Sequence, residues 1–325
     1  MQIAVIGAGL AGLACAEQLR DSGHAPILFE KSRGVGGRMS TRRVEIDHGQ
    51  VGFDHGAQYM TVRDPGFVRL VQSWQAAGLA APWPAAGDEA WVGVPGMNAP
   101  ARAMADRFDV RRGQRVTALE AWPDGWHLRL ADEQETAGPF AAAIVAVPAE
   151  QAGPLLAAIA PDWSALALAT RSSPCWTVMA AFAARLPVET DVIKKRGPIG
   201  WAARNSAKPG RSGPEAWVIQ ADADWSAANL EMTPEQAQDR LLGIFAETMG
   251  LDLPQTLSLS AHRWRYAKSG TAERGTAERG TAARTALWDP DRRLGVCGDW
   301  LLGPRVESAF LSGTGLAAMI PAQAG

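Results

Sequence analysis

The sequence predicts a mixed α/β fold in which a domain built on a parallel sheet is joined to a second, α+β domain. A short apolar strand, a glycine-rich turn and a helix follow one another at 2–23, and a similar strand, turn and helix recur at 294–320. Several strands bounded by turn residues lie between these segments and predict the second domain. The length of 325 residues leaves room for about two domains.

The N-terminal segment justifies the parallel sheet. Residues 2–6 are apolar and rich in β-branched side chains, as in a buried strand. Residues 7–12 read Gly-Ala-Gly-Leu-Ala-Gly, which has the spacing GxGxxG, and a helical pattern continues to Gly23. A second apolar strand at 26–30 then ends on an acidic residue. Strand, glycine turn, helix and acidic strand end together predict a Rossmann-type site for a dinucleotide.

Each residue of this pattern has a physical task. Gly7 makes the tight turn, Gly9 lets the backbone approach a pyrophosphate, and Gly12 lets the helix pack on the strand. The N-terminus of the helix, which includes Ala11, faces the phosphates. Glu30 can accept hydrogen bonds from ribose hydroxyls, and its charge would repel a 2′-phosphate. The site is therefore predicted to take FAD or NAD rather than NADP.

The residues after Glu30 distinguish FAD from NAD. They run directly from Lys31 into Gly36, Gly37 and Arg38. This resembles the E-x(5)-GGR signature of the flavin amine oxidase superfamily, in which the glycine pair allows close approach to the cofactor and the arginine adds charge near its phosphates. The resemblance implies FAD.

A matching segment lies near the C-terminus. The apolar strand 294–297 precedes Gly298-Asp299, and a helix opens after Arg305. In this superfamily the aspartate of such a pair bonds the ribityl chain, and the following helix points its N-terminus at the flavin N1/C2 carbonyl region. Negative charge collects there on reduction, so the helix dipole and Arg305 would stabilise it.

Two further segments narrow the resemblance. Residues 54–59 (DHGAQY) look like a D-x-G-A-Q-Y segment, and residues 262–267 (HRWRYA) look like an H-x-W-R-Y/H segment. With Gly298-Asp299-Trp300 and Arg305-Val306-Glu307, they resemble the renalase family and its bacterial relatives. The specific motifs lie at 3–60 and 257–318, and 150–250 carries little signature.

The resemblance implies an FAD-dependent oxidase that takes hydride from 2- or 6-dihydro isomers of NAD(P) and passes the electrons to O2. The products would be NAD(P)+ and hydrogen peroxide. The predicted substrate-side residues are His262, Trp300, Tyr59 and Gln58. The predicted residues of a non-covalent FAD site are Gly7, Gly9, Ala11, Gly12, Glu30, Lys31, Gly36, Gly37, Arg38, His55, Gly56, Ala57, Val116, Gly298, Asp299, Arg305, Val306 and Ser308.

The flavin domain is predicted to be discontinuous. It takes residues 1–62, 96–150 and 290–325, and a substrate (cap) domain takes 63–95 and 151–289. This division follows from the two ends of the chain carrying the two cofactor segments.

Composition limits partners and location. The net charge of −2 gives no basic excess for nucleic acid. The apolar run 3–16 is too short to span a membrane. Cys15, Cys175 and Cys297 have no metal-ligand spacing, so we expect no metal and a reducing cytoplasm. A five-residue repeat at 270–284 (GTAER, GTAER, GTAAR) is predicted to be a surface loop.

An amine oxidase or a desaturase-type oxidoreductase on the same fold is the alternative. Amine oxidases use a lysine near flavin N5. The lysines here are Lys31, Lys194, Lys195, Lys208 and Lys268. None lies in a predicted strand of the cap sheet, which disfavours amine chemistry. Lys194-Lys195-Arg196, with Arg204, Lys208 and Arg211, could steer the phosphates of a dinucleotide, or could belong to a solvated loop.

Overall fold

The structure is a computed structural model, and its described residues are 1–47, 49–131, 136–270 and 285–322. The chain forms two compact units. The first unit comprises Met1–Gly37, Ala101–Ser172 and Ser269–Gly325, and the second comprises Arg38–Pro100 and Ser173–Lys268. Of the segments predicted for the flavin domain, 38–62 and 96–100 thus belong to the second compact unit, and of those predicted for the cap domain, 151–172, 269–270 and 285–289 belong to the first. The assignment of whole segments to cofactor or substrate binding stays a prediction.

The core of the first unit is a largely parallel sheet. Its strands, in spatial order, are β18 (Leu287–Asp289), β19 (Leu294–Val296), β12 (Ala142–Val145), β1 (Gln2–Ile6), β2 (Ala25–Glu30) and β8 (Asp109–Arg112). Val5 pairs with Leu28 on one side and Ile144 on the other, both in parallel register. The apolar strands predicted from the sequence at 2–6 and 26–30 are therefore confirmed.

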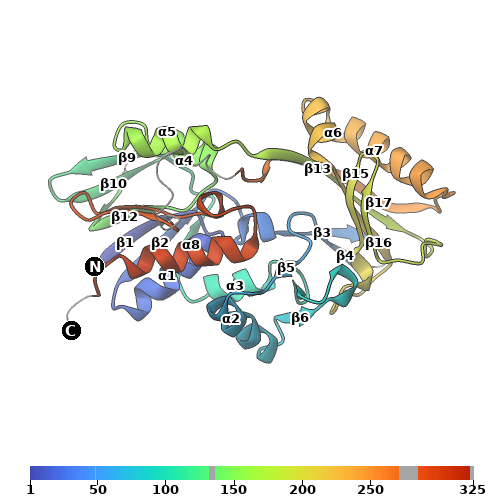
Figure 1. The fold of residues 1–325 in the computed structure, drawn as a ribbon, viewed down its shortest axis with the longest axis horizontal. Helices are drawn as coiled ribbons and strands as arrows, with labels where there is room; N and C mark the ends of the chain where they lie inside the picture. Colours follow the sequence, from blue (N-terminus) through green and yellow to red (C-terminus); the bar gives the residue numbers. More distant parts are fainter. Residues whose placement is uncertain (48, 132–135, 271–284, 323–325) are drawn as a thin grey trace, which may run out of the picture. The chain divides into compact units, whose positions relative to one another are not determined.

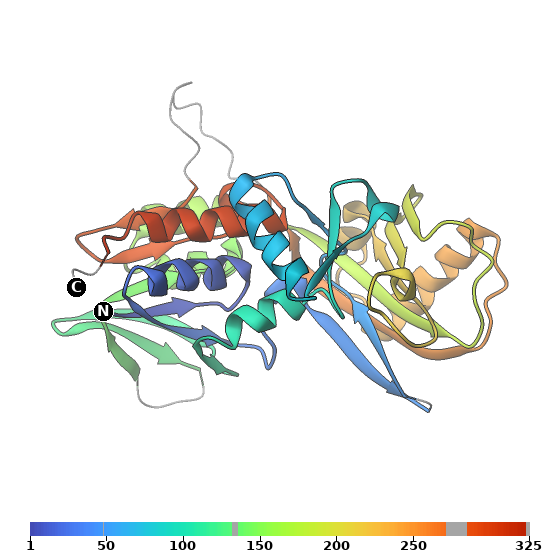
Figure 2. The same cartoon turned by 90° about the horizontal axis from the view of Figure 1, so that it is seen from below.

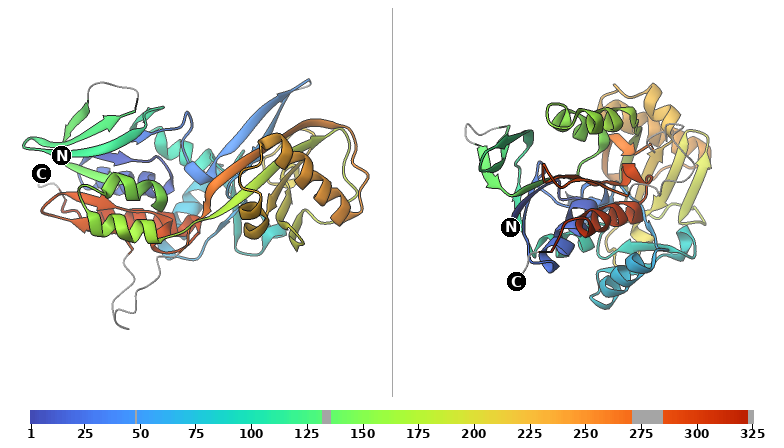
Figure 3. Two further views of the ribbon diagram at one scale, coloured as in Figure 1. Left: turned by 90° about the horizontal axis from the view of Figure 1, so that it is seen from above. Right: turned by 60° about the vertical axis from the view of Figure 1, so that its left-hand side comes forward.

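Helices cover both faces of this sheet (Figures 1 and 3). On one face lie α1 (Leu10–Asp21) and α8 (Val306–Ala318), side by side. A Cβ on Gly313 of α8 would stand 2.2 Å from the carbonyl oxygen of Ala11 in α1, so glycine permits their close approach. On the other face lie α4 (Ala149–Leu156) and α5 (Pro161–Ala169).

An antiparallel sheet completes the first unit. It is formed by β11 (Thr136–Phe140), β10 (Gly125–Leu130) and β9 (Val116–Trp122). Strands β9 and β10 pair in antiparallel register. The short helix α3 (Ala99–Ala105) buries Ala101, Met104 and Ala105.

The second unit is built on a five-stranded antiparallel sheet. Its strands, in spatial order, are β14 (Val192–Arg196), β15 (Ile199–Arg204), β16 (Glu215–Ala221), β13 (Ser173–Phe182) and β17 (Thr256–Lys268). Helix α7 (Pro234–Met249), which begins with a capping box between Thr233 and Gln236, packs Leu241 and Phe245 against one face. Helix α6 (Ala223–Ala228) precedes it.

The other face of this sheet receives a hairpin. Strands β3 (Thr41–Ile46) and β4 (Gly49–Asp54) pair in antiparallel register, and Val51 and Phe53 pack against Met179 and Val218. Figure 2 shows this hairpin in blue. The remaining elements are α2 (Pro65–Ala76), β5 (Met60–Thr61), β6 (Ala80–Pro82), β7 (Ala90–Gly93) and the 3₁₀ turns η1 (Gly37–Met39), η2 (Pro84–Ala86), η3 (Asn205–Ala207) and η4 (Asp299–Leu301).

The expectation that no lysine lies in a strand of the cap sheet, here the five-stranded sheet of the second unit, was wrong. Residues 194–196 are not a solvated loop, because they lie in β14. Lys268 is the last residue of β17. The argument that no lysine lies in a cap strand therefore fails for Lys194, Lys195 and Lys268. The repeat at 270–284 lies outside the described residues except for Gly270, and among the described residues no helix is long and apolar enough to cross a membrane.

Candidate active site

The glycine turn after β1 is shaped by contacts that exclude larger side chains. Gly7 has a φ of +107°, and a Cβ there would stand 2.5 Å from the carbonyl oxygen of Ala146. A Cβ on Gly12 would stand 2.1 Å from the carbonyl oxygen of Gly7. A Cβ on Gly9, in contrast, would meet nothing within 4 Å. Two glycines therefore build the turn, and Gly9 leaves open space over it.

Glu30 ties the end of β2 to this turn. The side chain is only 7% exposed, and its two carboxylate oxygens accept hydrogen bonds from the backbone N–H groups of Ala8 (3.0 Å) and Ser32 (2.8 Å). Each oxygen keeps a further lone pair, so the carboxylate can still accept from ribose hydroxyls. The N–H of Gln114 donates to the Glu30 carbonyl, which brings the start of β9 and Val116 next to the same strand end.

The Gly36-Gly37 pair lies against the same turn. The N–H of Gly36 donates to the carbonyl of Ala8 over 2.9 Å, and a Cβ on Gly37 would stand 3.6 Å from the Cα of Gly9. Both glycines have positive φ. The structure thus brings together three segments that the sequence assigned to one site: the first turn, Glu30 and the glycine pair. Lys31 lies beside them, where its ammonium donates to Gln151 over 3.0 Å and burial lowers its pKa.

The C-terminal turn follows β19 at the same edge of the sheet. The N–H of Gly298 donates to Ser312 over 2.9 Å, and Asp299 is 5% exposed and accepts from the Ser269 hydroxyl over 2.8 Å. Helix α8 then begins at Val306 with Arg305 as its N-cap, and Arg305 supplies no capping side-chain bond. Ser308 is buried in the first turn of this helix.

The residues present fit an FAD. The N-termini of α1 and α8 follow strands β1 and β19, so both lie at the carboxyl edge of one parallel sheet, where doubly wound folds bind dinucleotides. Neither helix has a side-chain cap, which leaves N–H groups directed at an anion. The open space over Gly9 and the accepting carboxylate of Glu30 match a pyrophosphate and a ribose.

Trp300 does not have the predicted position. Its side chain is completely buried in the core of the first unit, and its indole N–H donates to the Val147 carbonyl over 3.3 Å. A Cβ on Gly298 would stand 2.7 Å from its ring. The expectation that Trp300 walls the flavin is corrected: it packs under the Gly298-Asp299 turn, and its large apolar area explains why the core takes it.

The sheet of the second unit carries a row of side chains on one of its faces. The register pairs His262 with Thr177, Thr177 with Gln220, Gln220 with Trp201, and Trp201 with Lys194. Residues paired in this way stand on one face of a sheet. This face is opposite the one that α7 covers, since Trp176 and Val178, on either side of Thr177, alternate with it along β13 and pack with α7. We call these five residues the polar row.

The sheet that carries the polar row is almost free of negative charge. Glu215 is the one acidic residue in its five strands, all of which are described. Its carboxylate accepts from the Arg204 guanidinium (3.0 Å) and the Trp217 indole (2.8 Å). No strand of this sheet therefore offers a free carboxylate to a cationic substrate.

His262 lies at one end of the row in a defined tautomer. An Arg42 guanidinium N–H lies 3.4 Å from its Nδ1, and because arginine can only donate, Nδ1 is the acceptor and the ring proton is on Nε2. Burial, and then the charge of Arg42, lower the pKa of His262 to about 4. At neutral pH it is an uncharged ring with an Nε2–H donor.

His55 and Trp264 complete this end of the row. The two rings stack with centroids 5.2 Å apart, and the ring of His262 meets the ring of His55 edge-on at 5.0 Å. Burial, with the neighbouring His262 and Arg42, lowers the pKa of His55 to about 3. The result is a cluster of flat, uncharged rings.

Residues 54–58 cross this face with their carbonyl groups held by side chains. The Trp264 indole donates to the His55 carbonyl over 2.8 Å, and the Gln220 amide donates to the Gly56 carbonyl over 2.9 Å. A Cβ on Gly56 would stand 2.0 Å from the Arg38 carbonyl, which accepts from the N–H of Ala57 over 2.8 Å. Backbone of the two predicted cofactor segments, at 38 and at 55–57, is thus in contact.

Gln58 does not have the substrate-facing orientation expected from the sequence. It is 6% exposed, its amide N–H groups donate to the carbonyls of Asp54 and Gly56, and its Oε1 accepts from Lys208 over 3.2 Å. Its hydrogen-bonding groups are therefore used within the protein. We correct its role to positioning the 54–58 segment.

Tyr59 lies near the other end of the row. Its ring is 5.3 Å from that of Trp201, and the ammonium of Lys194 lies 5.2 Å over Trp201 while donating to the Ala86 carbonyl. Sequence reasoning missed Arg42, Thr177, Trp201 and Gln220. None belongs to a motif, and only the strand register brings them together.

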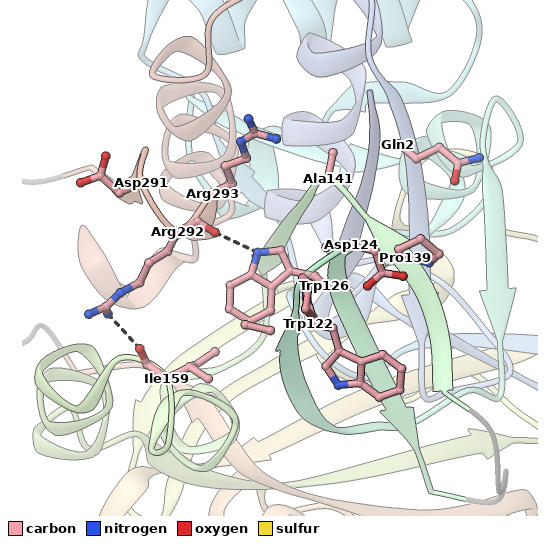
Figure 4. Close-up of a pocket in the computed structure, with 13 residues that line it drawn as sticks. Gln2, Trp122, Asp124, Trp126, Pro139, Ala141, Ile159, Asp291, Arg292 and Arg293 are labelled. Atoms are coloured by element: carbon pink, nitrogen blue, oxygen red, sulfur yellow. Dashed lines mark hydrogen bonds between the residues drawn. The ribbon is translucent and has the colours of Figure 1, made fainter.

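A pocket of about 780 Å³ lies elsewhere in the first unit (Figure 4). Its lining includes Gln2, Ala141 and Arg293, which stand at or just before the starts of β1, β12 and β19. It therefore lies at the opposite edge of the sheet from the glycine turns, and no predicted site residue lines it. Among the described residues no cluster of His, Cys, Asp or Glu could hold a metal ion.

Comparison with known proteins identifies the class of enzyme. Residues 85–320 match the family model described as flavin containing amine oxidoreductase, and residues 5–74 match that of an NAD(P)-binding Rossmann-like domain. The 15-cis-phytoene desaturase of Synechococcus elongatus is 47% identical over 45 residues, which are 14% of this chain and 10% of the desaturase. The chain thus matches about a tenth of the length of this curated relative.

Solved structures share the fold over nearly the full length. Cyclohexylamine oxidase from Brevibacterium oxydans IH-35A superposes with a TM-score of 0.68 at 14% identity, covering 98% of both chains. A protein from Exiguobacterium sp. 255-15, provisionally named protoporphyrinogen oxidase, superposes with a TM-score of 0.73 at 11% identity, also over 98% of both chains. At these identities the likeness concerns the fold alone.

Proposed function

Because the chain belongs to the family of flavin-containing amine oxidoreductases, and is an FAD-dependent oxidoreductase, we propose that its substrates are dihydro-NAD(P) isomers reduced at ring position 2 or 6. The FAD supplies hydride acceptance and returns the electrons to O2, so the products would be NAD(P)+ and hydrogen peroxide. The proposal refines the family assignment by naming the substrate.

The observation that carries the proposal is the polar row on a sheet without a free carboxylate. A protonated amine would need a negative partner, and Glu215, the one acid of these strands, is already bonded to Arg204 and Trp217. A dihydronicotinamide brings a neutral flat ring and a carboxamide, attached to anionic phosphates. Flat uncharged rings, amide groups and nearby arginine suit that chemistry.

The titration of the two histidines supports the same substrate. Loss of hydride from a dihydronicotinamide gives an aromatic cation directly, so no proton has to be removed. A general base works best with a pKa near the working pH. The pKa values of His55 (about 3) and His262 (about 4) are too low for that task. We assign to the Nε2–H of His262 a hydrogen bond to the substrate carboxamide oxygen.

Amine oxidation remains the second candidate, because Lys194, Lys195 and Lys268 lie in strands of the cap sheet. Lys194 belongs to the polar row itself, at the end opposite His262. If a neutral lysine at this sheet acts in amine chemistry, the enzyme should accept primary amines. The two candidates therefore make opposite predictions for the same measurement.

The test is anaerobic stopped-flow absorbance of the oxidised flavin band. The purified holoenzyme is mixed separately with 2- and 6-dihydro isomers of NAD and NADP, with the ordinary 4-dihydro forms, and with benzylamine and a polyamine. We expect a 2- or 6-dihydro isomer to bleach the flavin fastest and one peroxide to be released per turnover on reoxidation. Faster bleaching by an amine than by every dihydronicotinamide would establish amine oxidation instead.

A further inference from the structure

A buried lysine lies behind the 54–58 segment. The side chain of Lys208 is completely buried, and its ammonium donates to Asp54 Oδ2 and to Gln58 Oε1, each over 3.2 Å. It also lies 5.1 Å over the ring of Trp83. Burying an ammonium is costly unless it is paired and hydrogen-bonded, so this placement reflects a specific set of partners.

Asp54 is the centre of the charge cluster. Its Oδ2 also accepts from Arg211, and its Oδ1 accepts from the N–H of Met97 over 2.9 Å and from the hydroxyl of Thr41 over 2.7 Å. Burial raises the pKa of Asp54, but the charges of Lys208 and Arg211 and the hydrogen bonds from Met97 and Arg211 outweigh it and hold the pKa at about 2. One carboxylate thus faces two cations, and the buried cluster carries net positive charge while Lys208 is protonated.

Gln58 links this cluster to the backbone of the candidate site. Its Oε1 accepts from Lys208, which orients the amide so that its N–H groups reach the carbonyls of Asp54 and Gly56. The His55 carbonyl between them accepts from Trp264. Three consecutive carbonyl groups are therefore fixed. Gln58, which Lys208 orients, holds the Asp54 carbonyl and shares the Gly56 carbonyl with Gln220.

We infer that Lys208 is a positioning residue: through Gln58 it holds the 54–58 backbone in the conformation needed for flavin reduction. Lys208 contacts neither substrate nor cofactor in this role. The inference rests on the proposed function only because it assumes that the 54–58 segment takes part in flavin reduction. It applies equally if the substrate is an amine. A lysine that merely stabilised the fold would not link the rate of flavin reduction to its own protonation.

The protonation of Lys208 predicts a specific pH dependence for the rate of flavin reduction. Burial, partly offset by Asp54 and reinforced by Arg211, lowers the pKa of Lys208 to about 8. Asp54 and Arg211 are the charged groups that face it among the described residues, and the pKa of Asp54, about 2, lies far below that pH. As pH rises through 8, Lys208 loses its positive charge and its hold on Gln58 weakens. The rate of flavin reduction should fall with it.

The experiment compares two Lys208 variants and one control variant in the holoenzyme. Lys208→Met removes the charge, Lys208→Arg keeps it, and Arg69→Met is the control because Arg69 is an exposed residue of α2 outside the candidate site. We expect Lys208→Met to lower the limiting rate of flavin reduction about tenfold or more and to lose the alkaline fall near pH 8. Lys208→Arg should restore part of the rate and move the fall to higher pH, and Arg69→Met should match the wild type.

Amide hydrogen exchange of 54–58, measured without cofactor and with it, gives a readout independent of activity. It should accelerate locally in Lys208→Met and not in Arg69→Met. If Lys208→Met does not fold, Gln58→Met breaks the same link while leaving the Lys208–Asp54 pair, and should show the same rate loss. A wild-type rate and wild-type pH profile in Lys208→Met, or in Gln58→Met when the former is unfolded, would overturn the inference.

The substrate for these rates is whichever compound reduces the wild-type flavin fastest. Failure of every dihydronicotinamide in the wild type would therefore refute the proposed function and leave the test of Lys208 intact. Conversely, normal kinetics of the Lys208 variants with a dihydronicotinamide would refute only the positioning role.

Discussion

The residues predicted to hold the cofactor in the first unit and those proposed to meet the substrate in the second are assembled in different ways. The first unit uses backbone: the turns 7–12, 36–37 and 298–306 bring N–H groups and open glycine surfaces to one sheet edge. The second unit uses side chains from five separate strands, placed in the polar row by register. We expect a substitution in one of these turns to weaken cofactor binding strongly, because each turn is a single stretch of backbone. The polar row spreads its contacts over five strands, so the loss of one side chain should weaken substrate binding less.

The largest expected effect comes from adding one methyl group to the glycine turn. In Gly12→Ala the new Cβ would stand 2.1 Å from the Gly7 carbonyl oxygen, a distance that only backbone movement can relieve. Overpacking of this kind costs about 1–3 kcal/mol or more. We expect purified Gly12→Ala to contain little or no FAD and to unfold at lower temperature.

Gly243→Ala is the matched control for this substitution. Gly243 lies in α7, and a Cβ there would meet nothing within 4 Å. Alanine in a helix interior is favoured over glycine by about 1 kcal/mol, so this variant should be as yellow as the wild type and slightly more stable. Full FAD content in Gly12→Ala would show that the turn is not rigid, and the comparison would fail.

Removal of one carboxylate should have a smaller effect than distortion of the turn. Glu30→Ala deletes two bonds to backbone N–H groups and the proposed acceptor of the ribose hydroxyls. A hydrogen bond to a charged group contributes about 1.5–3 kcal/mol, so FAD affinity should fall about tenfold to a hundredfold. Titration of the apoprotein with FAD measures it, with exposed Glu45→Ala as the control. Equal affinities in the two variants would remove Glu30 from the site.

The contrast between local turns and side chains brought together by strand register explains what could be predicted from the sequence. The strand 2–6, Glu30 and the turn at 298–299 were found because each part of their signal is local. Trp300 was misplaced because the motif fixes its neighbours and not the direction of its own ring, which the core of the first unit determines.

The substrate side was less accessible to prediction. Arg42, Thr177 and Gln220 lie in ordinary strand sequence, and their meeting depends on pairings between residues far apart in the chain. Gln58 was found by its motif, but its inward orientation depends on Lys208, 150 residues away. Partners at such separation leave no local pattern.

The smallest effect is expected for substitution of His262, one member of the polar row. In His262→Phe the ring remains and the Nε2–H donor is lost, and in His262→Gln an amide N–H takes a similar position. A neutral hydrogen bond contributes about 0.5–1.5 kcal/mol, so kcat/KM for a dihydronicotinamide should fall about twofold to tenfold in His262→Phe and recover in His262→Gln. The loss should be in KM if the bond forms equally in the ground and transition states. An unchanged kcat/KM in His262→Phe would remove the donor from the site.

The pH dependence of the wild type and of His262→Phe distinguishes two roles for His262, a neutral hydrogen-bond donor and a general base. Burial and Arg42 lower the pKa of His262 from 6.5 to about 4. The unfolded chain therefore takes up a proton as pH falls below about 6.5 while the folded chain does not, so His262 costs stability progressively between those two values.

Wild-type flavin reduction should stay constant from pH 7 down to about pH 5, because the ring is uncharged throughout. Thermal unfolding of His262→Phe should be less sensitive to acid over the same interval. A rate that falls in the wild type with a midpoint near 6.5, and does not fall in His262→Phe, would show a titrating base at this position and would return the choice of substrate to the amines.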